Sequence, residues 1–317
     1  MSTGRSHKTS LKLPTELMGV SDDDITQYYK IYKKQLLGRG QYGKVSLATS
    51  KRDESLKYAV KTIKNASESD SKHWKRAKKE FEVHRFLDHA NIAMFNQAFH
   101  QDDKLYLVIE LCEGRNLSEV LLEKKQFSEE ETKLIFYQAL LAVNYLHQIG
   151  VCHRDVKAEN FILGNDNKLK MIDFGLSEFF RNARLRSMVG TPYYVAPELF
   201  SGRYDQKCDE WSMGVLLFTM ISGVPPFIGR TDEDTIERVK NGSYNYNSMV
   251  WHTVSKPAKE LINSLLRKNP KTRITTALAL QSSWFHELEV ERAISRMSLL
   301  PEDFCDHIFD FRFSSIF

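Results

Sequence analysis

The stretch "HRDVKAENFILGNDNKLKMIDFG", residues 153–175, is the most informative part of this chain. It places Asp155, Lys157, Asn160 and Asp173 among apolar residues of the kind that form partly buried strands. A buried charge is costly unless a partner compensates it, so these side chains require one. A polyanion held by metal ions would meet that requirement, because carboxylate and amide oxygens are the ligands that Mg²⁺ prefers beside phosphates.

The overall composition is that of an ordinary globular protein. Its 317 residues are 42% hydrophobic and 27% charged, which favours about two domains or lobes. The net charge of +4 is small and the basic residues are dispersed, apart from "SKHWKRAKK" (71–79), so we expect no nucleic-acid partner. The four cysteines lie far apart without metal-ligand spacing, so neither a zinc site nor a disulfide framework is indicated: Cys112, Cys152, Cys208 and Cys305.

Membrane and export signals are not expected in this sequence. The first residues lack the apolar core of a signal peptide, and Ser2 stands where N-myristoylation requires glycine. The longest apolar run, "MGVLLFTMI" (213–221), is too short to span a bilayer. We therefore expect a cytoplasmic protein without membrane insertion.

The hydrophobic periodicity changes along the chain. Residues 1–30 are polar and predict a flexible extension, whereas 32–63 alternate in short runs separated by glycines, which indicates strands. A helix over 73–87 and an apolar strand over 105–112 complete this part. After Gly114 the period becomes helical, so a strand-rich lobe precedes a helical lobe.

The clearest helix signal is "FSEEETKLIFYQALLAVNYLHQIG", residues 127–150. Ser128 as the N-cap and Glu131 three residues later form a capping box, and Gly150 suits the end of the helix. The stretches "WSMGVLLFTMISG" and "PAKELINSLLRKN" predict further helices.

A glycine pattern in "LGRGQYGKV" points to phosphate binding. The GxGxxG spacing of Gly38, Gly40 and Gly43 also occurs in dinucleotide-binding turns, but there a helix follows. Here the following residues read as strand, so we predict a hairpin whose backbone N–H groups approach phosphates. Val45 comes next and could cover a base. Lys61, in the apolar strand "YAVKTI", is a candidate phosphate-binding cation that needs an anionic partner from the next helix.

Taken in order, the glycine loop, "AVK", "HRDVKAEN", "DFG" and "APE" (196–198) resemble the eukaryotic protein kinases over roughly residues 32–285. Segments such as "GTPYYVAPE" resemble the calmodulin-kinase group, most of all the kinase domains of calcium-dependent protein kinases of plants and protozoan parasites. The resemblance implies an α+β, bilobal fold in which an antiparallel five-stranded N-lobe (31–113) carries one αC helix. A mostly helical C-lobe (114–285) and a helical tail (286–317) would follow.

The resemblance also assigns a nucleotide site. Lys61 would contact the α- and β-phosphates and pair with Glu80 rather than Glu82, because His89 of "LDHANI" fixes the register. Ile109 would be the gatekeeper residue beside the hinge. The residues expected to bind ATP are Leu37, Gly38, Gly40, Gly43, Val45, Ala59, Lys61, Glu80, Glu110, Cys112 and Ile162.

The catalytic roles follow from the same resemblance. Asp155 would be the catalytic base, and Lys157 would contact the γ-phosphate and mark Ser/Thr specificity. Asn160 is counted with these two and would also bind Mg²⁺ together with Asp173. His153 would pack and form hydrogen bonds rather than act as a base.

Two structural roles are implied as well. Glu198 would pair with Arg273, and Asp209 would brace the catalytic loop.

These assignments imply a Ser/Thr protein kinase that transfers the γ-phosphoryl group of Mg·ATP to protein hydroxyls, with ATP and protein substrates as partners. One alternative is a pseudokinase scaffold, which the intact Lys61, Asp155, Asn160 and Asp173 disfavour. A second is a small-molecule phosphotransferase, which the long segment 173–198 disfavours.

Several residues depart from the family pattern. Ala158 replaces a proline in the catalytic loop, and His84 takes an apolar position on the αC helix. Asn116 stands where relatives carry a glutamate that reads a substrate arginine, so only a mild basophilic preference is expected, through Glu159. No segment matches the EF-hand calcium loop, so we expect no direct response to Ca²⁺.

Two regulatory expectations remain. The tail, 286–317, carries apolar helical faces and would pack on the C-lobe or serve as an autoinhibitory or partner-docking segment. Phosphorylation of Ser187 would raise activity if Arg154 receives the phosphate. Glu178 argues against this, because its charge would repel a phosphate.

Overall fold

A computed structural model describes residues 19–40, 43–64, 72–180, 185, 190, 192–202 and 204–286. The chain divides into two compact units. The N-terminal unit comprises Met1–Leu87 and Ala93–Cys112, and the C-terminal unit comprises Asp88–Ile92 and Glu113–Phe317. Within the described residues, no helix combines the length and apolar character needed to cross a membrane.

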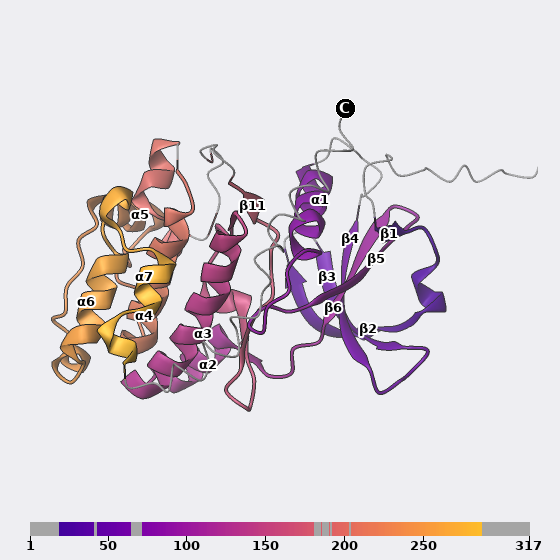
Figure 1. Ribbon diagram of the computed structural model, residues 1–317, viewed down its shortest axis with the longest axis horizontal. Coiled ribbons are helices and arrows are strands. Elements are labelled where there is room, and N and C mark those ends of the chain that lie inside the picture. Colours follow the sequence, from indigo (N-terminus) through magenta and orange to yellow (C-terminus); the bar gives the residue numbers. More distant parts are fainter. Residues whose placement is uncertain are drawn as a thin grey trace, which may run out of the picture. The chain divides into compact units, whose positions relative to one another are not determined.

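The N-terminal unit is a six-stranded sheet with the strand order β1-β5-β6-β4-β3-β2, accompanied by one long helix, α1 (Figure 1). Its elements are β1 (Val20–Ser21), β2 (Tyr29–Gly40), β3 (Gly43–Ser50), β4 (Lys57–Lys64), α1 (Lys72–His84), β5 (Phe95–Gln101) and β6 (Lys104–Glu110). Every neighbouring pair is antiparallel except β1 and β5, which run parallel. The sheet therefore has one strand more than the sequence predicted, and that strand is parallel.

Apolar side chains pack on both faces of this sheet. On one face Ile63 and Leu105 pack with Phe81 of α1. On the other face Val60 packs with Ile25, which precedes β2 and is only 1% exposed. Burial of Ile25 removes apolar surface from water, which stabilises this arrangement. The sheet and its core thus include residues that precede residue 31.

The C-terminal unit is mostly helical. Its helices are α2 (Leu117–Lys124), α3 (Glu129–Gln148), α4 (Lys207–Ser222), α5 (Asp232–Asn241), α6 (Lys256–Leu265) and α7 (Thr276–Leu280). Its short strands are β7 (Arg115–Asn116), β8 (Val151–Cys152), β9 (Phe161–Leu163), β10 (Leu169–Met171) and β11 (Glu178–Phe179). A 3-10 turn, η2 (Ala158–Asn160), leads directly into β9.

Helix α3 begins as its sequence predicted. The Ser128 side chain accepts a hydrogen bond from the backbone N–H of Glu131, and the Glu131 side chain accepts one from Ser128. This confirms the capping box, which satisfies two donors that a helix start leaves unpaired. At the other end Gly150 has a φ of +77°, which glycine adopts without steric cost.

Helix α4 forms the centre of the C-terminal unit. Its residues from Cys208 to Ile221 are all buried, and they include the carboxylates of Asp209 and Glu210 in the first turn. A Cβ at Gly214 would lie 2.9 Å from Leu265 Cβ, so glycine allows α4 and α6 to approach closely. The expected roles of Ser187 and of residues 287–317 fall outside the described residues and stay predictions.

Candidate active site

The glycine-rich loop is a β-hairpin. Gly38 pairs with Val45 and Gly40 with Gly43 across the antiparallel strands β2 and β3, and no helix follows. This excludes the dinucleotide-binding turn that the glycine spacing also allowed. A Cβ at Gly43 would lie 2.3 Å from the carbonyl oxygen of Thr62, so only glycine fits there. Gly38 has no heavy atom within 4 Å of that position and leaves space over its backbone.

The strand register groups the predicted nucleotide-binding residues of the N-terminal unit. Val45 lies opposite Lys61 on neighbouring strands, and Ala59 lies opposite Ile109. Because alternate residues of a strand point to the same face, Ala59 and Lys61 share the face that carries α1. Leu37, which lies on β2, has an exposed fraction of 49%.

Lys61 is paired within this unit. Its Nζ lies 2.5 Å from Oε1 of Glu80 on α1, and both residues are buried, at 8% and 4% exposed. Glu80 is thus the partner, as chosen over Glu82 from the sequence. A buried ammonium group needs such an anion, and the pair fixes where the Lys61 charge lies.

The predicted hinge residues lie at the end of β6. The N–H of Glu110 donates a hydrogen bond to the carbonyl oxygen of Met94 at 2.9 Å, so this donor is already used, and Cys112 follows, half-buried.

His84 has a hydrogen-bond partner inside the N-terminal unit. It is 1% exposed, and its Nε2 lies 2.7 Å from the carbonyl oxygen of Ala93. A polar ring is therefore tolerated at an apolar position because its nitrogen has a hydrogen-bond partner.

In the C-terminal unit, Asp209 holds the catalytic loop. This fully buried carboxylate accepts hydrogen bonds from the backbone N–H groups of His153 and Arg154, both at 2.8 Å. The brace predicted for Asp209 is confirmed. Arg154 has a φ of +67°, a strained conformation that persists only where surrounding contacts impose it.

The loop orients its functional groups through hydrogen bonds among themselves. Lys157 Nζ lies 2.8 Å from Oδ2 of Asp155, and Asn160 Nδ2 donates to the carbonyl oxygen of Asp155 at 2.7 Å. Because the amide nitrogen of Asn160 is committed to the loop, its oxygen is the atom left to face a metal ion. His153 packs its ring against Phe174, in line with a supporting role.

The β9–β10 hairpin brings the two predicted metal ligands together. Met171 pairs with Phe161, and the N–H of Ile172 donates to the carbonyl of Asn160 at 3.0 Å. Asp173 therefore follows at the same end of the hairpin as Asn160. One amide oxygen and one carboxylate at this end fit the oxygen-donor set that Mg²⁺ prefers. Ile162, half-buried on β9, pairs with Lys170.

His147 is a residue that the sequence interpretation missed. Its Nε2 lies 2.9 Å from Asp209 Oδ2, and its Nδ1 lies 3.4 Å from Glu210 Oε1. Burial would lower the pKa of His147, but the Glu210 carboxylate and the hydrogen bond to Asp209 raise it to about 10. Burial would raise the pKa of Asp209, but its hydrogen bond with His147 and its backbone donors keep it below the usual value. A histidine in the last turn of a buried helix was the available signal.

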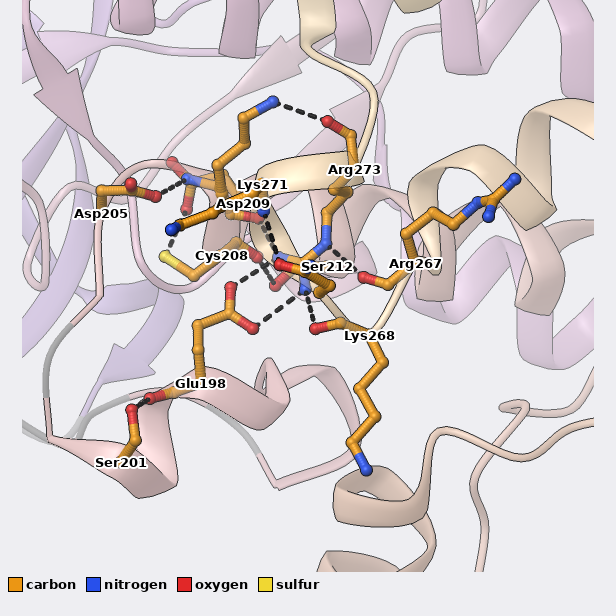
Figure 2. Close-up of polar contacts among 12 residues, drawn as sticks. Glu198, Ser201, Asp205, Cys208, Asp209, Ser212, Arg267, Lys268, Lys271 and Arg273 are labelled. Carbon is orange, nitrogen blue, oxygen red and sulfur yellow. Dashed lines mark hydrogen bonds and ion pairs between the residues drawn. The ribbon is translucent and has the colours of Figure 1, made fainter.

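A second buried ion pair secures the segment after the site. Figure 2 shows the Glu198 carboxylate facing the Arg273 guanidinium, with distances of 2.5 Å to Nη1 and 2.9 Å to Nη2. Arg273 also donates to the carbonyl of Arg267 at 2.9 Å. This bidentate pair confirms the predicted partnership of Glu198 and Arg273, and it ties the 3-10 turn after Ala196 to the chain beyond α6.

Arg154 is engaged by a carboxylate. Its Nη1 lies 2.8 Å from Oε2 of Glu178 on β11, and its Nε donates to the carbonyl of Leu176 at 2.6 Å. The Arg154 side chain is 5% exposed and that of Glu178 is 29% exposed. The residue expected to receive a phosphate from Ser187 therefore already has an anionic partner on its own chain.

Comparison with known proteins gives the family. The model of the protein kinase domain matches residues 31–285. The chain therefore belongs to the protein kinase family, whose members use ATP together with Mg²⁺, and these are its cofactors.

Within this family, the chain is similar to calcium-dependent protein kinases. The chain is 36% identical over 274 residues to calcium-dependent protein kinase 5 of Plasmodium berghei (strain Anka), covering 85% of this chain and 48% of that protein. It is 37% identical over 272 residues to calcium-dependent protein kinase 29 of Arabidopsis thaliana, covering 84% and 50% respectively. The chain thus spans about half the length of the curated relatives it matches.

The raised pKa of His147, whose side chain is 9% exposed, leads us to predict a pH-dependent contribution to stability. Because its folded pKa is raised, this contribution is complete below about pH 6.5 and is lost as the pH rises through about 10. We expect His147→Gln to lower the free energy of unfolding by about 3 kcal/mol between about pH 5 and 6.5, since it leaves two buried carboxylates without a cation. The difference from the natural chain should shrink towards about pH 10.

Thermal and urea unfolding at several pH values would measure this difference. His252→Gln is the matched control, because His252 is exposed and its replacement should change little at any pH. A difference for His147→Gln that stays constant with pH would contradict the proposed charge on His147.

Proposed function

We propose that this chain is an ATP-dependent Ser/Thr protein kinase that transfers a phosphoryl group to protein hydroxyls. The observation that carries the proposal is the arrangement of the catalytic loop. Asp155 is held by Lys157 at 2.8 Å and by Asn160, on a backbone anchored to the buried Asp209. A scaffold that only binds partners would have no physical need for this set of oriented groups.

The proposed mechanism relies on positioning and charge. Mg·ATP would supply the transferable phosphoryl group and most of the countercharge for it. Asp155 would orient the substrate hydroxyl and accept its proton, and Lys157 beside it would stabilise negative charge that develops on the phosphoryl oxygens. Asn160 and Asp173 would hold the metal through their oxygens. Lys61, kept in place by Glu80, would bind the phosphates of the nucleotide.

Two substitutions separate these roles. Asp155→Asn should keep nucleotide binding nearly unchanged and lower the rate of phosphoryl transfer by about 10³-fold, because the proton acceptor is lost. Asp173→Asn should weaken Mg²⁺-dependent nucleotide binding, because a metal ligand is lost. The measurements are peptide phosphorylation rates and ATP titrations with and without Mg²⁺.

Asp166→Asn is the control for this pair. Asp166 is an exposed carboxylate in the turn between β9 and β10 and should tolerate the change. Near-normal turnover by Asp155→Asn would contradict the mechanism. A natural chain that binds Mg·ATP but transfers no phosphate to any peptide would instead support the pseudokinase scaffold.

We further propose a mild preference for basic substrates. Asn116 caps α2 by accepting from the N–H of Ser118, and its Nδ2 donates to the carbonyl of Glu159 at 2.6 Å. The amide of Asn116 supports the loop but offers no negative charge to a substrate arginine. The exposed carboxylate of Glu159 would still provide a negative charge for that arginine.

Positional-scanning peptides test this preference. We expect Glu159→Gln to reduce the discrimination between arginine- and alanine-containing peptides by about fivefold, the effect of one exposed ion pair. Glu119→Gln, which removes an exposed carboxylate from α2, should leave the discrimination unchanged. Equal discrimination by the natural chain and Glu159→Gln would contradict the assignment.

We also propose that Glu178 replaces an activating phosphate. The backbone N–H of Arg154 donates a hydrogen bond to Asp209. The guanidinium group of Arg154 forms an ion pair with Glu178, with 2.8 Å between Nη1 and Oε2. A charge that is nearly buried needs such an anion to keep its position. Phosphorylation of Ser187 is then not required to order the strand that follows the metal ligand Asp173.

This proposal predicts opposite outcomes for two substitutions. Ser187→Ala should phosphorylate peptides at the rate of the natural chain, and mass spectrometry should find Ser187 unmodified in active protein. Glu178→Ala should lower that rate by at least about tenfold, because Arg154 loses its partner. Glu237→Ala, at an exposed position of α5, is the control. A strong loss in Ser187→Ala with little effect of Glu178→Ala would overturn the proposal.

A further inference from the structure

A basic groove lies on the N-terminal unit, apart from the residues assigned to catalysis. Its volume is about 1020 Å³, and the side chains around it include seven lysines and arginines but a single carboxylate, Asp102. Successive residues of a strand point to opposite faces. Ile63 of β4 packs with α1, so its neighbours Thr62 and Lys64, which line the groove, point to the face away from α1.

The groove contains like charges in direct register. Arg39 of β2 lies opposite Lys44 of β3, and Lys64 of β4 lies opposite Lys104 of β6. Like charges directly opposite each other on neighbouring strands repel and destabilise a sheet. No ion pair joins these four side chains to a carboxylate within the part of the chain that the structure describes. Among the described residues the repulsion is therefore uncompensated, and a bound anion would relieve it.

The shape of the groove and the residues at its floor favour a peptide over a bilayer surface or a nucleic acid as the bound anion. Ile31 and Tyr106 are half-buried at the floor, and Ile25 and Tyr29 are buried beneath them. A bilayer surface is too flat to enter a hollow of this kind. A single-stranded nucleic acid binds through exposed aromatic rings on which its bases stack, whereas here Tyr29 is only 7% exposed and Tyr106 is half-buried. An extended peptide can instead place carboxylates on the rim and an apolar side chain on the floor.

We propose that this groove binds an acidic peptide segment of a partner protein. The charge complementarity would mainly speed association and make binding sensitive to salt. Lys61 and Ala59 lie on the opposite face of the same sheet, so the peptide would not occupy the position of the nucleotide phosphates, while Gly43 of the glycine loop lines the groove. The groove would therefore serve to recruit a partner protein from the face of the sheet opposite Lys61.

A binding experiment on the full chain tests the proposal. The probe is a fluorescein-labelled 12-residue peptide, three repeats of Glu-Glu-Phe-Asp, followed by fluorescence anisotropy at low and high salt. We expect binding that weakens with salt, and we expect the double variant Lys33→Glu with Lys64→Glu to weaken it by about tenfold or more. Lys64→Glu also places a carboxylate opposite Lys104, so the sheet should be no less stable.

The matched control is Lys34→Glu with Lys57→Glu. It makes the same change in net charge with exposed lysines of the same two strands, β2 and β4, that do not line the groove. Both double variants should keep the melting temperature and the peptide phosphorylation rate of the natural chain. Equal weakening by the two double variants would show a non-specific charge effect and overturn the proposal.

Binding of other molecules to the groove gives the remaining outcomes of this experiment. A 12-residue peptide in which glutamine and asparagine replace the acids should not bind. Tighter binding of a single-stranded DNA 12-mer, or of phosphatidylserine vesicles, that depends on Lys33 and Lys64 would also overturn the proposal, because it would assign the groove to another class of partner. Failure of the acidic peptide to bind would overturn the proposed role of the groove, and it would leave the proposed kinase activity untouched, since that activity is measured separately.

Discussion

The buried carboxylate of Asp209 is the interaction on which the catalytic part of this protein depends. It accepts hydrogen bonds from two consecutive backbone N–H groups, those of His153 and Arg154, and it is neutralised by His147. A charge in this position would be prohibitive without those partners. Because α4 carries Asp209 and is itself buried from Cys208 to Ile221, the loop is held by a helix in the core of its unit.

The same physical principle recurs at the other functional positions. Lys61 is held by Glu80, Arg154 by Glu178, and Glu198 by Arg273, each through a short contact in a largely buried setting. Buried ion pairs contribute little net stability compared with apolar packing, but breaking one is costly. They are therefore suited to fixing the position of a charged group rather than to strengthening the fold. In a protein kinase, catalysis rests on such positioning.

Departures from the family pattern are explained by local contacts. His84 is acceptable in an apolar position because Ala93 provides a hydrogen-bond acceptor. Asn116 exchanges the charge of a glutamate for a helix cap and a hydrogen bond to the catalytic loop. Glu178 supplies an anion to Arg154 from the chain itself. Each of these three side chains thus has a hydrogen-bond or ion-pair partner within its own unit.

The sequence by itself determined the class of fold, the order of the motifs and the capping of α3, because these depend on local patterns and on residue types at fixed spacing. The family resemblance, through the spacing of Glu80 from His89, also identified Glu80 as the partner of Lys61. The sequence could not reveal His147 as the counterion of Asp209, because the two are 62 residues apart and meet only through packing of α3 on α4.

The tertiary structure alone decided the remaining features. The parallel strand β1 and the burial of Ile25 come from residues whose polar surroundings predicted an extension. The basic groove arises from lysines and arginines scattered over four strands, which only the sheet register places side by side. Dispersed charges give no sequence signal, because a period of two tells which face a side chain takes but not which strand will lie beside it.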